Sequence, residues 1–175
     1  MQIFLLIIGA LAVLILGIVT YSMFLPPNVK VERTLLIAAP AAAIFDRVNI
    51  LRNWELWSPW QQLDPAMKIV YGEKESGVGA GFSWESRHRH VGNGSMTIVE
   101  SRPVEYIATN SNFMHQGIAR GYFRFEPVAG GTQVTWGMQA DMGQNPIRKL
   151  LGLVMDKWVG SDFEKGLANL RQVLA

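Results

Sequence analysis

The 175-residue sequence contains no cysteine. This absence excludes disulfide bonds and thiolate metal sites, and it fits either side of a membrane. Charge is also sparse, since the net charge of +2 arises from 16 basic and 14 acidic residues scattered among one another. The sequence shows neither a basic stripe for nucleic acid nor a polybasic lipid patch, so we expect no nucleic-acid partner.

Charged side chains are missing altogether from residues 1–29, and residues 3–25 are mostly Ile, Leu, Val, Ala, Phe and Met. An apolar helix of about 20 residues, rising about 1.5 Å per residue, matches the roughly 30 Å hydrocarbon core of a bilayer. Pro26 and Pro27 then end the run. We predict a transmembrane anchor and short linker over residues 1–28, followed by one domain over residues 29–175.

Two alternatives to the anchor are a cleavable signal peptide and a buried helix of a soluble protein. A signal peptide has a basic start, an apolar centre of about 7 to 15 residues and a small-x-small cleavage site. Here Gln2 stands at the start, the apolar centre is longer, and residues 20–23 (Thr-Tyr-Ser-Met) offer no clean cleavage site. The sequence therefore favours an uncleaved anchor.

The orientation of the anchor follows from the basic residues that flank it. Lys30, Arg33, Arg47 and Arg52 follow the apolar run, whereas only the amino terminus precedes it. Positive charge is retained on the cytoplasmic side of membranes. We expect a single-pass protein of the cell membrane with a cytoplasmic domain, and the opposite orientation is the alternative.

The residues after the anchor form one domain long enough to enclose its own core. Alternating residues predict a strand over 29–37, and helical spacing predicts helices over 41–48 and 50–57. Period-two patterning with glycine punctuation then predicts antiparallel strands. These strands are expected near 67–72, 80–87, 92–101, 104–112, 117–128 and 132–140.

The C-terminal segment has the pattern of a long amphipathic helix. Asn145 is a capping residue and Pro146 suits the first helical position. Gly160 and Ser161 interrupt the apolar stripe, and we expect a kink or break there because glycine costs a helix roughly 1 kcal/mol relative to alanine. The order of elements predicts an α+β fold in which a curved antiparallel sheet wraps the last helix and leaves a cavity between them.

Several segments of this domain follow one another in an informative order. They are Asn53-Trp54-x-x-Trp57-Ser58-Pro59-Trp60, Asp64-Pro65 with Met67, Gly77-Val78-Gly79-Ala80 before Trp84, Val91-Gly92-x-Gly94-Ser95-Met96-Thr97-Ile98, Gly131-Thr132-x-Val134-x-Trp136 and Asp162-Phe163-Glu164-Lys165-Gly166-Leu167-x-Asn169-Leu170. Together they resemble the polyketide cyclase/dehydrase-like branch of the START-related (SRPBCC) superfamily. The resemblance implies a helix-grip fold around an apolar pocket for lipids, sterols or polyketides, often behind an N-terminal membrane helix. It implies no catalytic residues, because the superfamily shares no catalytic set.

The expected ligand-binding residues combine inward strand positions with the apolar helix stripe. Methionine suits such a surface because its unbranched, polarisable side chain adapts to irregular ligands. The alternative is a filled core without a cavity, since apolar inward residues fit both. The predicted set is Trp84, Met96, Ile98, Trp136, Met138, Met155 and Trp158. A separate group, Trp54, Trp57 and Trp60, is favoured as core, with a pocket rim or membrane interface as the alternative.

Metal binding and catalysis are both weakly indicated. His88 and His90 alternate on a strand pattern and would need His115 as a third ligand, but a solvated hairpin tip explains them better. We predict no metal and no cofactor. Ionisable groups that could act in acid/base chemistry are favoured as outer-face solvating residues instead. They are Glu85, Glu100, Tyr106, Arg120, Tyr122 and Asp141.

Three functions are compatible with these patterns. The leading hypothesis is a membrane-tethered module that binds a lipid or another small apolar molecule without catalysis. The second is a cyclase- or dehydratase-type enzyme using acid/base residues in the same cavity. The third is a protein-interaction module like the chaperone-activating relatives of the superfamily, which would expose a large apolar patch. The sequence does not specify the ligand or the oligomeric state.

Overall fold

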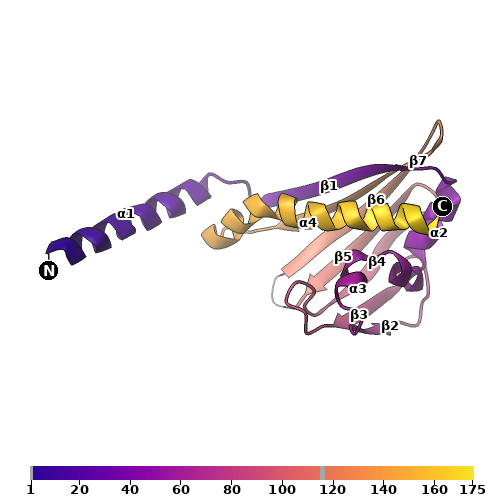
Figure 1. Cartoon of the computed structure of the whole chain (residues 1–175), viewed down its shortest axis with the longest axis horizontal. Helices are drawn as coiled ribbons and strands as arrows, with labels where there is room; N and C mark the ends of the chain where they lie inside the picture. The colour runs from indigo at the N-terminus through magenta and orange to yellow at the C-terminus, as the bar shows by residue number, and fades with distance from the viewer. Residues whose placement is uncertain (1, 115–116) are drawn as a thin grey trace.

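The computed structural model describes residues 2–114 and 117–175. The elements are α1 (Gln2–Met23), β1 (Asn28–Ile37), α2 (Ala41–Asn49), the 3-10 helix η1 (Leu51–Leu56), α3 (Pro59–Leu63), β2 (Lys68–Tyr71), β3 (Gly81–Glu85), β4 (Gly94–Arg102), β5 (Tyr106–Phe113), β6 (Gly117–Val128), β7 (Gly131–Asp141) and α4 (Pro146–Val173). The seven strands form one antiparallel sheet in the order β1-β7-β6-β5-β4-β3-β2. The sheet curves around α4, which confirms the predicted α+β helix-grip fold (Figure 1).

The sheet has one face toward α4 and one toward solvent, as the period-two pattern predicts. Val31 pairs with Met138 and both are buried, while their neighbours Lys30 and Gln139 pair on the opposite face. The face that carries Val31 and Met138 also carries Arg33, whose side chain reaches α4. We call it the concave face, and the opposite one the outer face.

The cap of α4 is as predicted. The Asn145 side-chain oxygen accepts from the backbone N–H groups of Ile147 (2.9 Å) and Arg148 (3.2 Å), and Pro146 occupies the first helical turn. Two N–H groups that a helix start leaves without partners are thereby satisfied.

The predicted break at Gly160 and Ser161 is wrong, because α4 continues through both residues. A side chain at Gly160 would collide with the guanidinium group of Arg33. That group bridges two carboxylates on either side of the glycine, Asp156 (2.9 Å) and Glu164 (2.6 Å). Gly160 therefore serves the close approach of β1 to the helix, and this packing outweighs its low helix propensity.

The helix predicted over residues 50–57 corresponds to the 3-10 helix η1. Pro59, which was expected only to end this helix, is also the first residue of α3. Trp54 and Trp57 are buried, and their indole N–H groups donate to the backbone oxygens of Val48 (2.8 Å) and Arg47 (3.1 Å). Their interpretation as core residues is confirmed.

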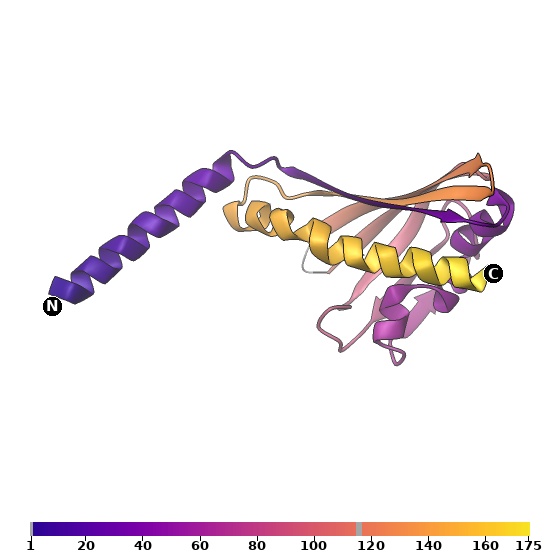
Figure 2. The same ribbon diagram turned by 45° about the horizontal axis from the view of Figure 1, so that its top comes forward.

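The N-terminal helix α1 is long and apolar enough to span a membrane, with a mean hydropathy of 3.0 over its best window. It extends away from the domain (Figures 1 and 2). Its last turn contacts the beginning of α4, where the Lys149 ammonium donates to the Met23 carbonyl oxygen at 3.5 Å. The linker is fixed as well, since Met142 N–H donates to the Pro27 oxygen at 2.7 Å.

Candidate functional site

The concave face is divided into two halves, and the half farther from α1 is filled with aromatic rings. Trp136 of β7 stacks on Phe163 of α4 with ring centroids 4.3 Å apart, and on Phe123 of β6 at 5.0 Å. Trp57 meets the same indole edge-on at 5.4 Å. Such contacts leave no room for a guest between the sheet and the second half of α4.

The half nearer α1 is lined by small side chains instead. Two rows of paired residues cross the strands here, and each row has small residues in its middle. The first row consists of Ala140, Ala119, Ser111 and Met96. The second row consists of Met138, Gly121, Thr109 and Ile98. We call this surface the open half of the concave face. The first half of α4 lies at the same level, because Gly152 approaches Val29, the partner of Ala140.

Several side chains around the open half are only partly buried although they point toward the concave side. They are Trp84 of β3, Ser111 and Phe113 of β5, and Met155 of α4. The Trp84 ring lies over Gly94, where an added Cβ would come within 2.5 Å of it. The border of the open half is therefore partly exposed and includes two aromatic rings, whereas Met96, Ile98, Thr109, Ala119 and Met138 within it are buried. A mainly apolar surface with a few polar groups is typical of ligand sites.

The seven predicted ligand-binding residues do not all lie together. Met96, Ile98 and Met138 are buried in the two rows of the open half. Trp84 and Met155 lie at its border, partly buried. Trp136 belongs to the filled half, and Trp158 is exposed on another face of α4. Ligand contact by any of them remains a prediction.

The small residues of the open half were not identified from the sequence. The inward positions of β5 and β6 carry large residues at one end, such as Ile107 and Phe123. Farther along the same strands, the inward positions carry the small residues Ser111, Ala119 and Gly121. The alternation within each strand shows that these small residues point inward. It does not show that they are neighbours, because that depends on the register in which the strands pair.

The six residues considered for acid/base chemistry do not face the open half. The strand registers place Glu85, Glu100, Tyr106, Arg120, Tyr122 and Asp141 on the outer face. There the Tyr122 ring covers Gly137 and its hydroxyl donates to the Glu32 carboxylate. Lys30, 2.8 Å from Glu32, and this hydroxyl lower the pKa of the Glu32 carboxyl. Burial, followed by the bond to Glu32, raises the pKa of Tyr122.

The outer face also has a polar hollow of about 190 Å³. Its lining residues are Lys30, Tyr106, Arg120, Tyr122, Arg124 and Gln139. Arg120 is 3.5 Å from Glu100, and Lys30 is paired with Glu32. Because its cations are partly neutralised by these acids, the hollow is a solvated charge network on the opposite side of the sheet from the open half.

The carboxyl group of Asp162, on α4, has a pKa above its ordinary value. Burial raises the pKa of the Asp162 carboxyl, and this effect outweighs the opposite influence of Lys165 and of the hydrogen bond from the Trp60 indole. A raised pKa in the folded state means that the charged carboxylate opposes folding, and this cost grows as the pH rises above the ordinary value of 3.8. Asp162 lies beside the filled half, one residue from Phe163.

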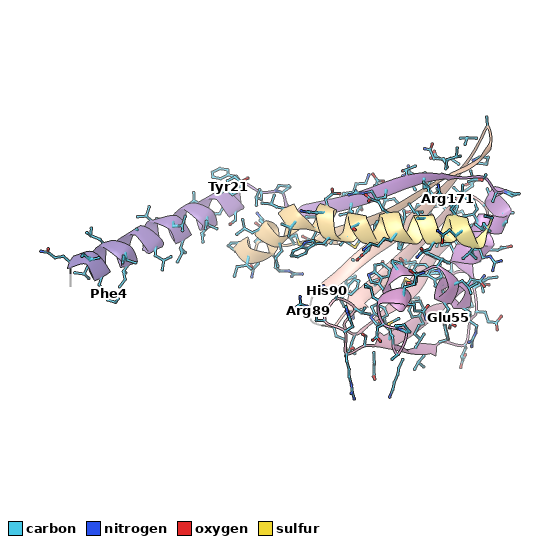
Figure 3. All side chains as sticks on the ribbon, viewed as in Figure 1. Phe4, Tyr21, Glu55, Arg89, His90 and Arg171 are labelled. Carbon is cyan, nitrogen blue, oxygen red and sulfur yellow. The ribbon has the colours of Figure 1, made fainter. Side chains whose placement is uncertain are left out.

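The histidine pair is a loop feature. His88 and His90 lie between β3 and β4, with ring centroids 5.6 Å apart, and Arg89 projects beside them (Figure 3). Within residues 2–114 and 117–175, no group of three or more histidine, aspartate or glutamate side chains is placed to hold a metal ion. His115, the suggested third ligand, lies outside the described residues.

Comparison with known proteins assigns the domain to a family. Residues 28–175 match the family described as "Polyketide cyclase / dehydrase and lipid transport". The chain belongs to this family. The match covers the whole sheet and α4 but not α1. The Polyketide cyclase / dehydrase and lipid transport family suggests a hydrophobic ligand-binding cavity, and no protein of curated function matches the sequence.

Solved structures share the fold at low sequence identity. SA2116 from Staphylococcus aureus, a protein of unknown function, is 13% identical with a TM-score of 0.64 over 84% of this chain and 93% of its own. StfQ, a di-domain ARO/CYC from the steffimycin biosynthetic pathway, is 12% identical with a TM-score of 0.62 over 84% of this chain and 50% of its own. DynU16, from the dynemicin biosynthetic locus, is 12% identical with a TM-score of 0.58 over 83% of this chain and 46% of its own. This chain thus spans about half the length of the latter two proteins.

Proposed function

We propose that the protein is a membrane-anchored module that binds a lipid or another small hydrophobic molecule in the open half of its concave face. The division of that face supports this assignment most directly. A fold whose only task was stability would fill the inward positions of β5 and β6 uniformly, because unfilled space costs stability. Here the filling stops at Ile107 and Phe123, and Thr109, Ser111 and Gly121 follow.

The chemistry of the open half fits a mainly apolar guest with one polar group. Met96, Met138 and Met155 present flexible thioethers that adapt to irregular shapes. The hydroxyl groups of Thr109 and Ser111 lie in the middle of the rows and can orient a polar group of the ligand. Binding is preferred to acid/base catalysis because the ionisable candidates lie on the outer face.

The anchor supports the same function. An apolar ligand partitions into the bilayer, and a binding domain tethered there meets it at a raised effective concentration. The helix α1 supplies the length and composition of such a tether. The basic residues that follow it, among them Lys30 and Arg33, favour a domain on the cytoplasmic side.

The test is to fill the open half and follow ligand occupancy. We expect Ser111→Phe to abolish binding, because the ring would occupy the space between Met96 and Ala119, its neighbours on adjacent strands. Native mass spectrometry of the full chain, released from membranes in mild detergent, should show bound hydrophobic material in the wild type and little or none in this variant.

Asn110→Phe is the matched control, because Asn110 is exposed on the outer face of the same strand. Lipid that adheres to α1 would be present in equal amounts in all three proteins, so only the difference between the variants reports on the site. Equal occupancy in the wild type and both variants would count against the proposed function.

A further inference from the structure

The helix α4 exposes an apolar stripe only in the half next to α1. Ile147, Leu151, Val154 and Trp158 are spaced four, three and four residues apart, which places them on one helical face. They are exposed, Ile147 by 69% and Leu151 by 49%. The same face continues with Ser161 and Lys165, so it becomes polar farther from α1. The stripe is therefore a local feature of the end at which α1 is attached.

The stripe faces the side of the molecule toward which α1 extends. Gly152 and Gly160 mark the opposite face of α4, since they approach Val29 and Arg33 of β1. In Figure 2, β1 lies above α4, and α1 runs downward and away from the end at which β1 and α4 begin. A bilayer crossed by α1 would thus lie toward the stripe.

Further apolar residues are exposed at the same end. Met114, just after β5, is 68% exposed. The start of β6 reaches α4, because Gly117 lies next to the Arg148 guanidinium, at 2.8 Å from an added Cβ. Phe24 of the linker is exposed as well. We call Met114, Phe24 and the stripe the α1-proximal surface.

Charge contributes little to this end of the molecule. Arg148, in the first turn of α4, lies next to Gly117. Lys149 is buried and donates to the Met23 carbonyl oxygen. Lys30 and Arg120 are paired with Glu32 and Glu100 on the outer face. The main feature of the α1-proximal surface is therefore its exposed apolar side chains.

We propose that the α1-proximal surface rests in the headgroup layer of the bilayer that α1 crosses. This inference relies on the membrane anchoring proposed above. A helix that lies along a membrane surface buries its apolar face at the boundary between headgroups and acyl chains. The stripe and Phe24 place exposed apolar side chains directly beside the end of α1.

The bilayer fits this surface better than a second copy of the chain does. The surface is continuous with α1, since the Lys149 ammonium donates to the Met23 carbonyl oxygen and Met142 N–H to that of Pro27. An α1 that crosses a bilayer therefore holds the stripe beside that bilayer, whether or not a second copy is present.

Single spin labels on the full chain test the contact, because the natural sequence has no cysteine to remove. The variants are Leu14→Cys in α1, Leu151→Cys and Val154→Cys in the stripe, and Lys165→Cys as control on the same face of α4. In vesicles of phosphatidylcholine and phosphatidylglycerol, labels at 151 and 154 should be several-fold more accessible to oxygen, relative to a water-soluble nickel complex, than the label at 165.

The label at Leu14 separates this inference from the anchoring on which it relies. If Leu14 reports bilayer while 151 and 154 behave like 165, the contact is refuted and the anchor stands. If Leu14 reports water, anchoring fails and the contact with it. Dipolar broadening at 151 that disappears on dilution with unlabelled protein would identify a second copy as the occupant and overturn the proposal.

Discussion

Replacing Trp136 by alanine is expected to lower the free energy of unfolding by about 3–5 kcal/mol, the range for a large aromatic residue in a well-packed core. Trp136 is only 3% exposed. Its ring is stacked between β6 and α4, on Phe123 and Phe163. Because the rings around it are themselves held by one another, they cannot collapse into the space, and a cavity remains.

The change is best measured by denaturant unfolding of the full chain in mild detergent, followed by near-ultraviolet circular dichroism. Trp158→Ala is the matched control, since the same side chain is removed from a position that is 62% exposed. We expect the control to differ from the wild type by less than about 0.5 kcal/mol. Similar losses in the two variants would show that the filled half is not the stabilising core of the domain.

Placing two arginines in the middle of α1, Leu11→Arg with Leu14→Arg, should release the protein from membranes. Each arginine at the centre of a transmembrane helix costs roughly 2.5–3.5 kcal/mol, or about 5–7 kcal/mol together. Both leucines are exposed on α1, so the domain loses no packing. Alkaline extraction of cell membranes should leave the wild type in the pellet and move the double variant to the supernatant.

Leu11→Ala with Leu14→Ala is the control, because it keeps the helix uncharged and should remain in the pellet. Intact mass adds a second criterion, since an uncleaved anchor leaves the full 19.5 kDa chain. A shortened chain, or a wild type that is extracted as readily as the arginine variant, would identify α1 as a signal sequence or a peripheral helix and would refute the anchor.

The strands and the long helix could be predicted because their signals are local. Alternation in residues 132–140 reflects burial of Val134, Trp136 and Met138 on one face, and this pattern is visible within the strand itself. The cap at Asn145 and Pro146 is equally local. Such features depend on neighbours in the sequence, so they are predictable without knowledge of the fold.

Features that depend on distant residues could not be predicted. Gly160 looks like a helix breaker until Arg33, more than 120 positions earlier, is placed against it and bonded to Asp156. The open half requires the register of β4 to β7. The exposed position of Trp158, which the apolar stripe predicts to face inward, depends on where α4 lies against β1. Nothing local marks which side of an apolar helix remains uncovered.

The exposed stripe beside α1 has the same origin. Gly152 and Gly160 approach Val29 and Arg33, and this packing of α4 on β1 decides which side of the helix stays uncovered. The property that makes this end a candidate membrane contact is thus one of tertiary structure.

The central claim, that a hydrophobic ligand occupies the open half, is tested most directly by photo-crosslinking. The full chain in lipid nanodiscs is exposed to a diazirine-bearing fatty acid, and the modified peptides are identified by mass spectrometry. The account predicts adducts on inward residues of β4, β5 and β6, with Met96 and Ser111 among them, and on Met155 of α4, all lost in Ser111→Phe. Adducts confined to α1 or to the outer face, unchanged by that substitution, would contradict it.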